Sequence, residues 1–157
     1  MAGEAKKSLK NLVKGKNPSP FATLAVALLS DDWATVEANL ADNIKWNMMP
    51  NAQNRKGKKN VVKFLKASYY AAKRKPKLIH DQVSKDWGCF EYYNIGITDK
   101  SIVEFAKQSK WPFSDTSKLV GRKYKVPVCF VWHTNPKGKI DLVREYLDVG
   151  SLVAQFK

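Results

Sequence analysis

The chain has 157 residues, of which 44% are hydrophobic, and this length and composition predict one globular domain with a core of its own. Its 28 lysines and arginines stand against 14 aspartates and glutamates, which gives a formal net charge of +14. No apolar run reaches the roughly 20 residues that a membrane span needs, and no apolar stretch follows the basic N-terminus, so we expect neither a membrane span nor a secretory signal. A cytoplasmic location is therefore predicted.

The N-terminal region, residues 1–17, is rich in lysine and only weakly apolar, and we interpret it as a flexible basic arm ahead of a single domain over residues 18–157. Lysine dominates over arginine and the charges are dispersed along the chain, so a solvated surface accounts for most of them. The alternative that stays open is that the arm binds nucleic acid or an acidic partner.

Three helices and one strand are predicted in the first half of the chain. Ser19 and Pro20 favour the start of a helix that is apolar nearly all round, and a second short helix follows. Residues 44–49 are predicted as a strand. Apolar side chains then recur at helical spacing from about residue 58 to residue 74, with lysines opposite, which predicts a long amphipathic helix.

Four strands in a meander are predicted in the second half. The first two cover residues 78–87 and 89–98, and the last two form a hairpin around the turn at residues 135–138. Between the pairs lies a polar insertion, residues 99–120, which is a candidate lid or an ordinary surface loop. A capping-box pattern inside it, at residues 101–104, predicts some helix.

Two segments carry a resemblance to a known family. Residues 121–148 read GRKYKVPVCFVWHTNPKGKIDLVREYLD and resemble the closing hairpin of the SnoaL-like and nuclear-transport-factor-2-like (NTF2-like) superfamily. Residues 28–46 read LLSDDWATVEANLADNIKW and resemble its opening helix pair and first strand. Over about residues 21–156, the resemblance implies an α+β, cystatin-like cone: a bent antiparallel sheet wrapped around the long helix, with two further N-terminal helices. It also implies a small-molecule pocket.

Relatives of three kinds were compared residue by residue. The ketosteroid isomerases need a carboxylate base and two oxyanion donors, and those positions fall at Met48, near Leu24 and near Phe130, where none of the side chains can transfer a proton. In the limonene epoxide hydrolases, an acidic residue of the last strand corresponds to Glu145. Their arginine and second aspartate correspond to positions near Tyr92 and Asn94.

Glu145 is our first candidate for a catalytic acid or base, since the SnoaL-like cyclases use a single carboxylate or histidine. His80 is the second candidate, provided that it faces inward. The alternatives are that Glu145 forms an ion pair with Arg144, Lys139 or a cross-strand lysine, and that His80 lies on the surface. We expect His133, beside the hairpin turn, to face solvent.

Strand alternation places one wholly apolar row of the hairpin inside the cone, and an unpaired carboxylate among such neighbours should have a raised pKa. The opposite row is half apolar, which predicts a homodimer through the outer face of the sheet. The residues predicted to line the pocket are Trp46, Asn47, Met48, Tyr92, Tyr93, Asn94, Val128, Phe130 and Trp132.

No phosphate-binding glycine loop, nucleophile motif or metal-ligand spacing occurs, so neither a cofactor nor a metal is predicted. Cys89 and Cys129 are interpreted as free thiols. The predicted function is cofactor-free acid–base chemistry on an apolar, secondary-metabolite-like small molecule: isomerisation, cyclisation, dehydration or epoxide hydration. The alternative is a non-catalytic binding or scaffold module of the same fold.

Overall fold

The computed structural model describes residues 18–156, so the predicted basic arm over residues 1–17 lies outside the described residues. The helices are α2 (Pro20–Leu29), α3 (Trp33–Asn39), α4 (Lys58–Tyr70), α5 (Ile102–Gln108) and α6 (Val149–Phe156), with 3-10 turns η1 (Met49–Asn51) and η2 (Thr116–Leu119). The strands are β1 (Leu40–Met48), β2 (Gln53–Lys56), β3 (Ala72–Arg74), β4 (Lys77–Ser84), β5 (Trp87–Thr98), β6 (Lys123–Thr134) and β7 (Ile140–Leu147). No helix among these residues is long and apolar enough to cross a membrane.

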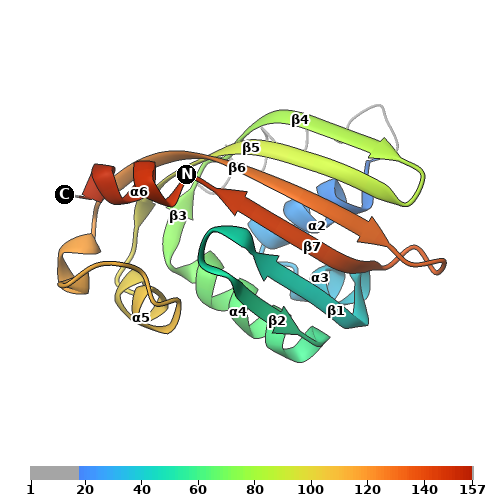
Figure 1. Ribbon diagram of the computed structural model, residues 1–157, viewed down its shortest axis with the longest axis horizontal. Helices are drawn as coiled ribbons and strands as arrows, with labels where there is room; N and C mark the ends of the chain where they lie inside the picture. The colour runs from blue at the N-terminus through green and yellow to red at the C-terminus, as the bar shows by residue number, and fades with distance from the viewer. Residues whose placement is uncertain (1–17, 157) are drawn as a thin grey trace.

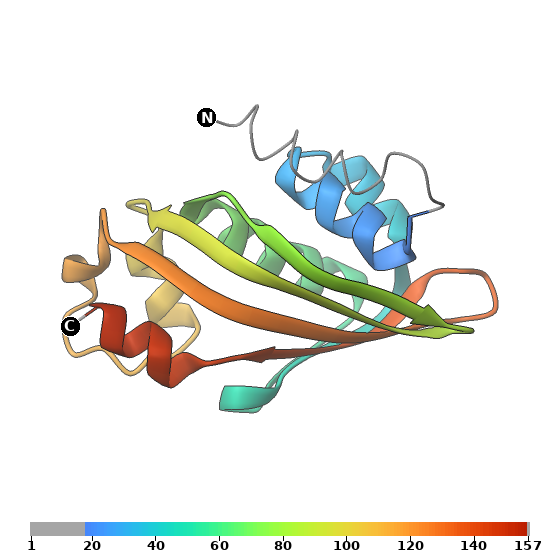
Figure 2. The same cartoon turned by 90° about the horizontal axis from the view of Figure 1, so that it is seen from above.

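One curled sheet with helices packed against its inner face makes up the predicted α+β cone (Figures 1 and 2). The strand order is β2-β1-β7-β6-β5-β3, and β4 also pairs with β5. Helices α2, α3 and α4 lie on the same side of the sheet, whereas α5 and α6 lie together at one end of it. The long helix and two N-terminal helices of the prediction are therefore present.

The prediction of an antiparallel sheet needs one correction, because β1 pairs with β7 in parallel. The β6–β7 hairpin sets the direction of β7, and β1 runs the same way when the curled sheet brings it alongside. These two strands are about a hundred residues apart in the chain, so no local sequence signal reports their relative direction.

Helix α4 is shorter than predicted, and two short strands were missed. The helix ends at Tyr70, and residues 72–74 form β3, which pairs with residues 96–98 of β5. Since the residue before Pro76 cannot easily be helical, the chain extends here and gains the sheet pairing. The polar strand β2 carries no apolar alternation that would have predicted it.

Side-chain caps explain where the first two helices begin. The Ser19 hydroxyl accepts a hydrogen bond from the backbone nitrogen of Ala22 at 2.9 Å, and the Asp32 carboxylate accepts one from Thr35 at 3.1 Å. Their positions aim Phe21 of α2 at the sheet.

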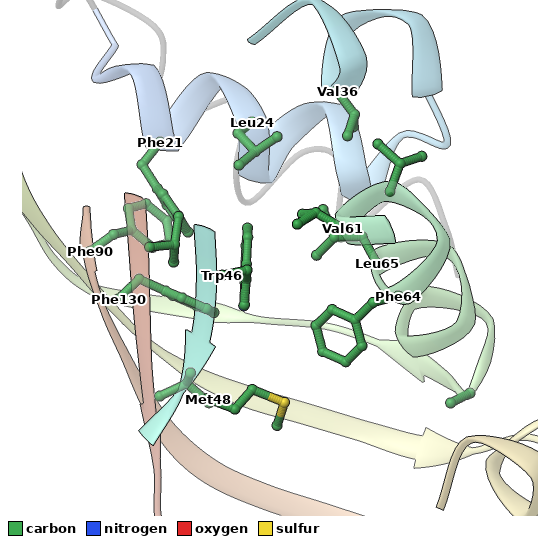
Figure 3. Close-up of a cluster of buried hydrophobic side chains, with 14 of the residues drawn as sticks. Phe21, Leu24, Val36, Trp46, Met48, Val61, Phe64, Leu65, Phe90 and Phe130 are labelled. Atoms are coloured by element: carbon green, nitrogen blue, oxygen red, sulfur yellow. The ribbon is translucent and has the colours of Figure 1, made fainter. Parts of the chain in front are cut away.

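An aromatic cluster joins α2 to the inner face of the sheet (Figure 3). The ring of Phe21 lies 4.8 Å from that of Phe130 and 5.3 Å from that of Phe90, and Trp46 meets Phe130 edge to face at 5.8 Å. Burying each such ring stabilises the fold by about 1.5–3 kcal/mol, and each aromatic pair adds about 0.5–1.5 kcal/mol. Phe64 of α4 closes the cluster from the other side.

The insertion over residues 99–120 is packed rather than free. It contains α5 and η2, as the capping-box pattern indicated in part, although Ser101 makes no side-chain cap. Trp111 packs on Phe105, and Phe113 packs on Phe156 of α6. The insertion therefore covers one end of the core.

The first residues of β6, before Val128, have no pairing partner on β7. The last β6–β7 pair joins Val128 to Leu147, so Pro127, which has no N–H to donate, lies where no strand needs that donor. Two residues earlier, the side-chain amide of Gln155 bonds both the nitrogen and the oxygen of Lys125, at 2.8 and 3.0 Å. Helix α6 thus substitutes for a strand at this edge.

Gly88 makes room for the buried indole of Trp132. The two residues are paired across β5 and β6, and a Cβ atom at position 88 would lie 2.1 Å from a ring carbon of Trp132. Trp132 is fully buried and stacks on Phe21, so it cannot move aside without opening the core.

Gly88→Ala is therefore expected to destabilise the fold by about 1–3 kcal/mol, the usual cost of overpacking a rigid site. Urea unfolding measures this change, with Ser84→Ala at an exposed position of β4 as the control. Equal unfolding midpoints for the two variants would contradict the assigned role of Gly88.

Candidate functional site

The main cavity lies between helices α2 and α4 and the inner face of the sheet, with a volume of about 110 Å³. Its walls are mostly apolar. The polar side chains that reach it, apart from the indole of Trp46, are Ser68, Tyr69, Arg74, Tyr92, Asn94 and Glu145. A second cavity of about 60 Å³ shares four of these six, which are Ser68, Arg74, Asn94 and Glu145. These four residues lie where the two cavities meet.

Glu145 projects from β7 into both cavities. It pairs with Phe130 on β6 and with Met48 on β1, and its Oε2 atom accepts a hydrogen bond from Nε1 of Trp46 at 2.8 Å. None of the ion pairs among residues 18–156 involves it. Arg144 points to the other face, and Lys139 bonds the backbone oxygen of Ala38, so neither forms the ion pair that the sequence left open.

Burial raises the pKa of Glu145 above its ordinary value, because water solvates the ionised carboxylate poorly there. The hydrogen bond from Trp46 and the charges of Arg74 and Arg55 act in the opposite direction, but burial outweighs them. A carboxyl group with a raised pKa holds a proton more readily than an exposed one, so it can both accept and return a proton.

Arg74 anchors a polar network on the opposite wall. Its Nη2 atom donates to the backbone oxygen and the hydroxyl of Ser68, at 2.6 and 3.3 Å, and its Nε atom donates to the Tyr124 hydroxyl at 3.3 Å. That hydroxyl donates in turn to Oδ1 of Asn94 at 3.3 Å. Gly96 permits this arrangement, because a Cβ there would lie 2.8 Å from the Tyr124 hydroxyl.

Tyr92 offers a neutral phenol to the main cavity. Its ring stacks on Phe130 with centroids 5.8 Å apart, and burial raises the pKa of its hydroxyl, which therefore stays protonated at neutral pH. Tyr92 is one of the residues that line the main cavity. It is placed to donate to a bound oxygen atom.

Arg55 stands behind the cluster on β2. Its guanidinium lies 3.8 Å from the centre of the Phe64 ring and donates to Gln53 at 2.7 Å. Burial lowers its pKa, and Glu145 counteracts that shift. The carboxylate therefore faces two arginines, neither of which touches it.

Seven of the predicted pocket and catalytic residues line one cavity or the other. Trp46, Tyr92, Asn94, Phe130 and Glu145 line the main cavity, and Met48 and Val128 line the second one. Trp132 belongs to the same inner row but is fully buried in the core beside Phe21, so it reaches neither cavity.

Three predicted positions need correction. Asn47 and Tyr93 alternate with inward-facing neighbours and therefore lie on the outer face of the sheet, where the ring of Tyr93 takes the Lys125 ammonium at 4.4 Å. His80 is exposed on β4 and bonds Gln82 at 3.1 Å, so it does not face inward.

His133 is more enclosed than expected. Its two ring nitrogens lie 2.6 Å from Asp141 and 3.0 Å from Asp86, which links the β4–β5 turn to the last hairpin. The hydrogen bond with Asp141 is the main cause of its raised pKa. His133 therefore links two turns on the outside of the cone and has a structural role.

Arg74, Ser68, Tyr69 and Tyr124 are polar residues of the two cavities that the sequence did not predict. Residue 74 was predicted as the end of the long helix, whereas its place in β3 depends on pairing with β5. Tyr124 could have been predicted from strand alternation, because it lies two residues before Val126 in the inward-facing row of β6.

These features define a class of protein: an α+β cone whose curled sheet and helices enclose a mostly apolar pocket with one buried carboxylate. The chain has the SnoaL-like and NTF2-like fold that the sequence predicted. No protein-family model matches the sequence, and no curated protein matches it either.

Solved structures of this fold resemble the chain over nearly its whole length. A provisionally assigned polyketide cyclase from Xanthomonas campestris pv. campestris is 16% identical with a TM-score of 0.65, over 98% of this chain and 99% of that one. An epoxide hydrolase of the limonene type from M. tuberculosis is 16% identical with a TM-score of 0.62, over 98% and 90%. A hypothetical protein from Catenulispora acidiphila with a ketosteroid isomerase-like fold, in complex with trimethylamine, is 12% identical with a TM-score of 0.65, over 89% and 93%.

Glu145→Gln is expected to stabilise the protein at pH 7 and to change its stability little near pH 4. In the unfolded chain the carboxyl ionises near its ordinary pKa of about 4.3, whereas the folded pKa is raised. The stability that this difference contributes is present below the unfolded pKa and is lost as pH rises through the folded pKa. Glutamine still accepts the Trp46 hydrogen bond and does not ionise.

Urea unfolding at the two pH values measures this difference, with Glu37→Gln at an exposed position of α3 as the control. An equal effect of Glu145→Gln at both pH values would show that the folded pKa is not raised.

Proposed function

We propose that the protein is a cofactor-independent enzyme that moves a proton on a small, mostly apolar substrate, with Glu145 as the acid or base. The observation that carries the proposal is a carboxylate that reaches into an apolar cavity, holds one hydrogen bond from Trp46 and forms no ion pair within residues 18–156. Its raised pKa suits proton transfer near neutral pH.

Enolisation is the reaction that this arrangement supports best. Glu145 would take a proton from the carbon beside a carbonyl group, the C–H electrons would form the enolate, and the phenol of Tyr92 would donate a hydrogen bond to its oxygen. When the enolate is conjugated, protonated Glu145 can return the proton to another carbon, which completes an isomerisation. When a hydroxyl group lies on the next carbon, the enolate electrons form the C=C bond as the C–O bond breaks, and the proton on Glu145 goes to that oxygen, which leaves as water and completes a dehydration. Epoxide hydration is less well supported, because Asn94 stands where a second carboxylate is expected.

The size of the main cavity restricts the substrate. An engineered apolar cavity of about 150 Å³ takes up benzene, so a volume of about 110 Å³ suits a substrate whose buried part is no larger than one ring. A substrate of several fused rings would have to displace the aromatic cluster around Phe21.

Exchange of α-protons for deuterium tests the proposal directly. In D₂O, the protein is expected to speed this exchange in small ketones such as cyclohexanone, as followed by proton NMR. Glu145→Gln should reduce the catalysed rate by about 10²–10⁴-fold without loss of ligand binding. Glu37→Gln serves as the matched control, since it removes an exposed carboxylate.

Ketones that bind to the protein but exchange at the same rate with and without Glu145 would contradict catalysis. That outcome would favour the second function that the sequence allowed, a non-catalytic binding module. The cytoplasmic location and the binding of nucleic acid or an acidic partner by residues 1–17 stay predictions.

We also propose that two copies associate through the outer face of the sheet. A shallow groove of about 540 Å³ lies there, lined by residues that include Met49, Pro127, Cys129 and Tyr146. Met49 is 45% exposed and Tyr146 is 41% exposed, which is unusual for apolar side chains grouped on a sheet.

Tyr146→Lys is expected to shift a dimer to monomers, because it places a charge in the proposed interface. Sedimentation velocity measures the mass, and Val120→Lys, at an exposed apolar position of the insertion, is the control. A protein that sediments as a monomer before any substitution would exclude this association.

A further inference from the structure

A second concave surface adjoins the main cavity and is strongly basic. This basic groove has a volume of about 1080 Å³ and runs along β3, the ends of β5 and β6, and the end of α4. Among residues 18–156, its charged lining residues include Lys73, Arg74, Lys123 and Lys125 and one acid, Asp99. Because a positive groove concentrates anions, it favours acidic ligands.

Arg74 belongs to both hollows. It lines the main cavity and the basic groove, and Tyr69 and Leu29 are the other residues that line both. A molecule seated between the cavity and the groove would therefore lie against the Arg74 guanidinium.

The charge of Arg74 has only neutral partners. Within residues 18–156, its hydrogen bonds go to the oxygens of Ser68, Tyr69 and Tyr124, and no ion pair includes it. Glu145 acts on it only across the cavity. Desolvating a cation without a contacting counter-charge is unfavourable, so an anion at this place would be bound strongly. The Nη1 atom makes only a long contact, 3.5 Å to the Tyr69 oxygen, so it is the nitrogen of the planar guanidinium best placed to bind a carboxylate.

The charges around the cavity do not balance. Within residues 18–156, the charged residues that line the two cavities are Arg74 and Glu145, and Arg55 lies outside both linings but interacts electrostatically with Glu145. Two positive charges therefore act on at most one negative charge, and on none when Glu145 carries a proton. The rest of the wall is aromatic and aliphatic, including Phe21, Leu28 and Phe130. A ligand that matches this wall combines a compact apolar body with one acidic group.

We infer that the substrate class is a small apolar carboxylic acid, such as an unsaturated or keto acid, whose carboxylate binds Arg74 at the junction with the basic groove. This inference rests on the proposed function for the site that the ligand occupies. It adds the group that orients the substrate: with the carboxylate held at Arg74, the apolar carbons extend toward Glu145.

Equilibrium binding of three ring compounds tests this assignment. By isothermal titration calorimetry at pH 7, benzoate is expected to bind at least tenfold more tightly than the neutral benzamide. Phenyl phosphate is expected to bind more weakly than benzoate. A tenfold ratio of dissociation constants corresponds to about 1.4 kcal/mol of binding free energy, which calorimetry resolves readily.

Arg74→Gln should abolish the preference for benzoate over benzamide, which is the ratio of the two dissociation constants measured on the same variant. Arg74→Lys keeps the charge without the planar fork, so it should lose at least fivefold in benzoate affinity. Arg122→Gln is the matched control, because that arginine is exposed and its side chain, among residues 18–156, donates a hydrogen bond to the backbone oxygen of Lys118.

Equal affinities of the unsubstituted protein for benzoate and benzamide would overturn the inference without any variant. A preference that survives Arg74→Gln or Arg74→Lys in full would overturn it as well, and tighter Arg74-dependent binding of phenyl phosphate would replace the carboxylate by a phosphate. Binding is measured without turnover. A missing deuterium exchange with the benzoate preference intact would therefore contradict the proposed function and leave this inference standing.

Discussion

The hydrogen bond from Trp46 to Glu145 is the contact on which the rest of the site depends. It holds a carboxylate among aromatic rings, where an ionised group is otherwise poorly tolerated. It also joins β1 to β7, the one parallel pair in the sheet, at the point where the curled sheet closes toward α4. Because the indole bonds only one carboxylate oxygen, the rest of the group stays turned toward the cavity.

The two walls of the cavity carry opposite kinds of polar group. One wall presents a single acid, and the other presents Arg74, Tyr124 and Asn94 in one hydrogen-bonded chain. In the function proposed above, this division would separate the group that exchanges protons from the groups that hold a ligand in place. Among residues 18–156, Glu145 is the only carboxylate that lines the two cavities, so the second carboxylate expected from the resemblance to the epoxide hydrolases is not found there.

The sequence predicted those parts of the structure that depend on the alternation of side chains along a single strand. The last hairpin, the inner row of Val128 and Phe130, and the inward direction of Glu145 all follow from a period of two residues along one strand. Asn47 and Tyr93 were predicted to line the pocket, but the alternation of side chains along β1 and β5 places both on the outer face of the sheet. Arg74 was beyond such reasoning, since it enters the site only when β3 pairs with β5 and ends the helix early.

The amide of Gln155 has a consequence for how the molecule avoids aggregation. This side chain hydrogen-bonds the backbone N–H and C=O of Lys125, so these groups of β6 are not available to pair with a strand of another molecule. Helix α6 therefore protects this edge of the sheet from pairing with another strand. A chain truncated before Gln155 would keep Glu145 and Arg74, yet it would leave the backbone groups of Lys125 free to pair with strands of other molecules.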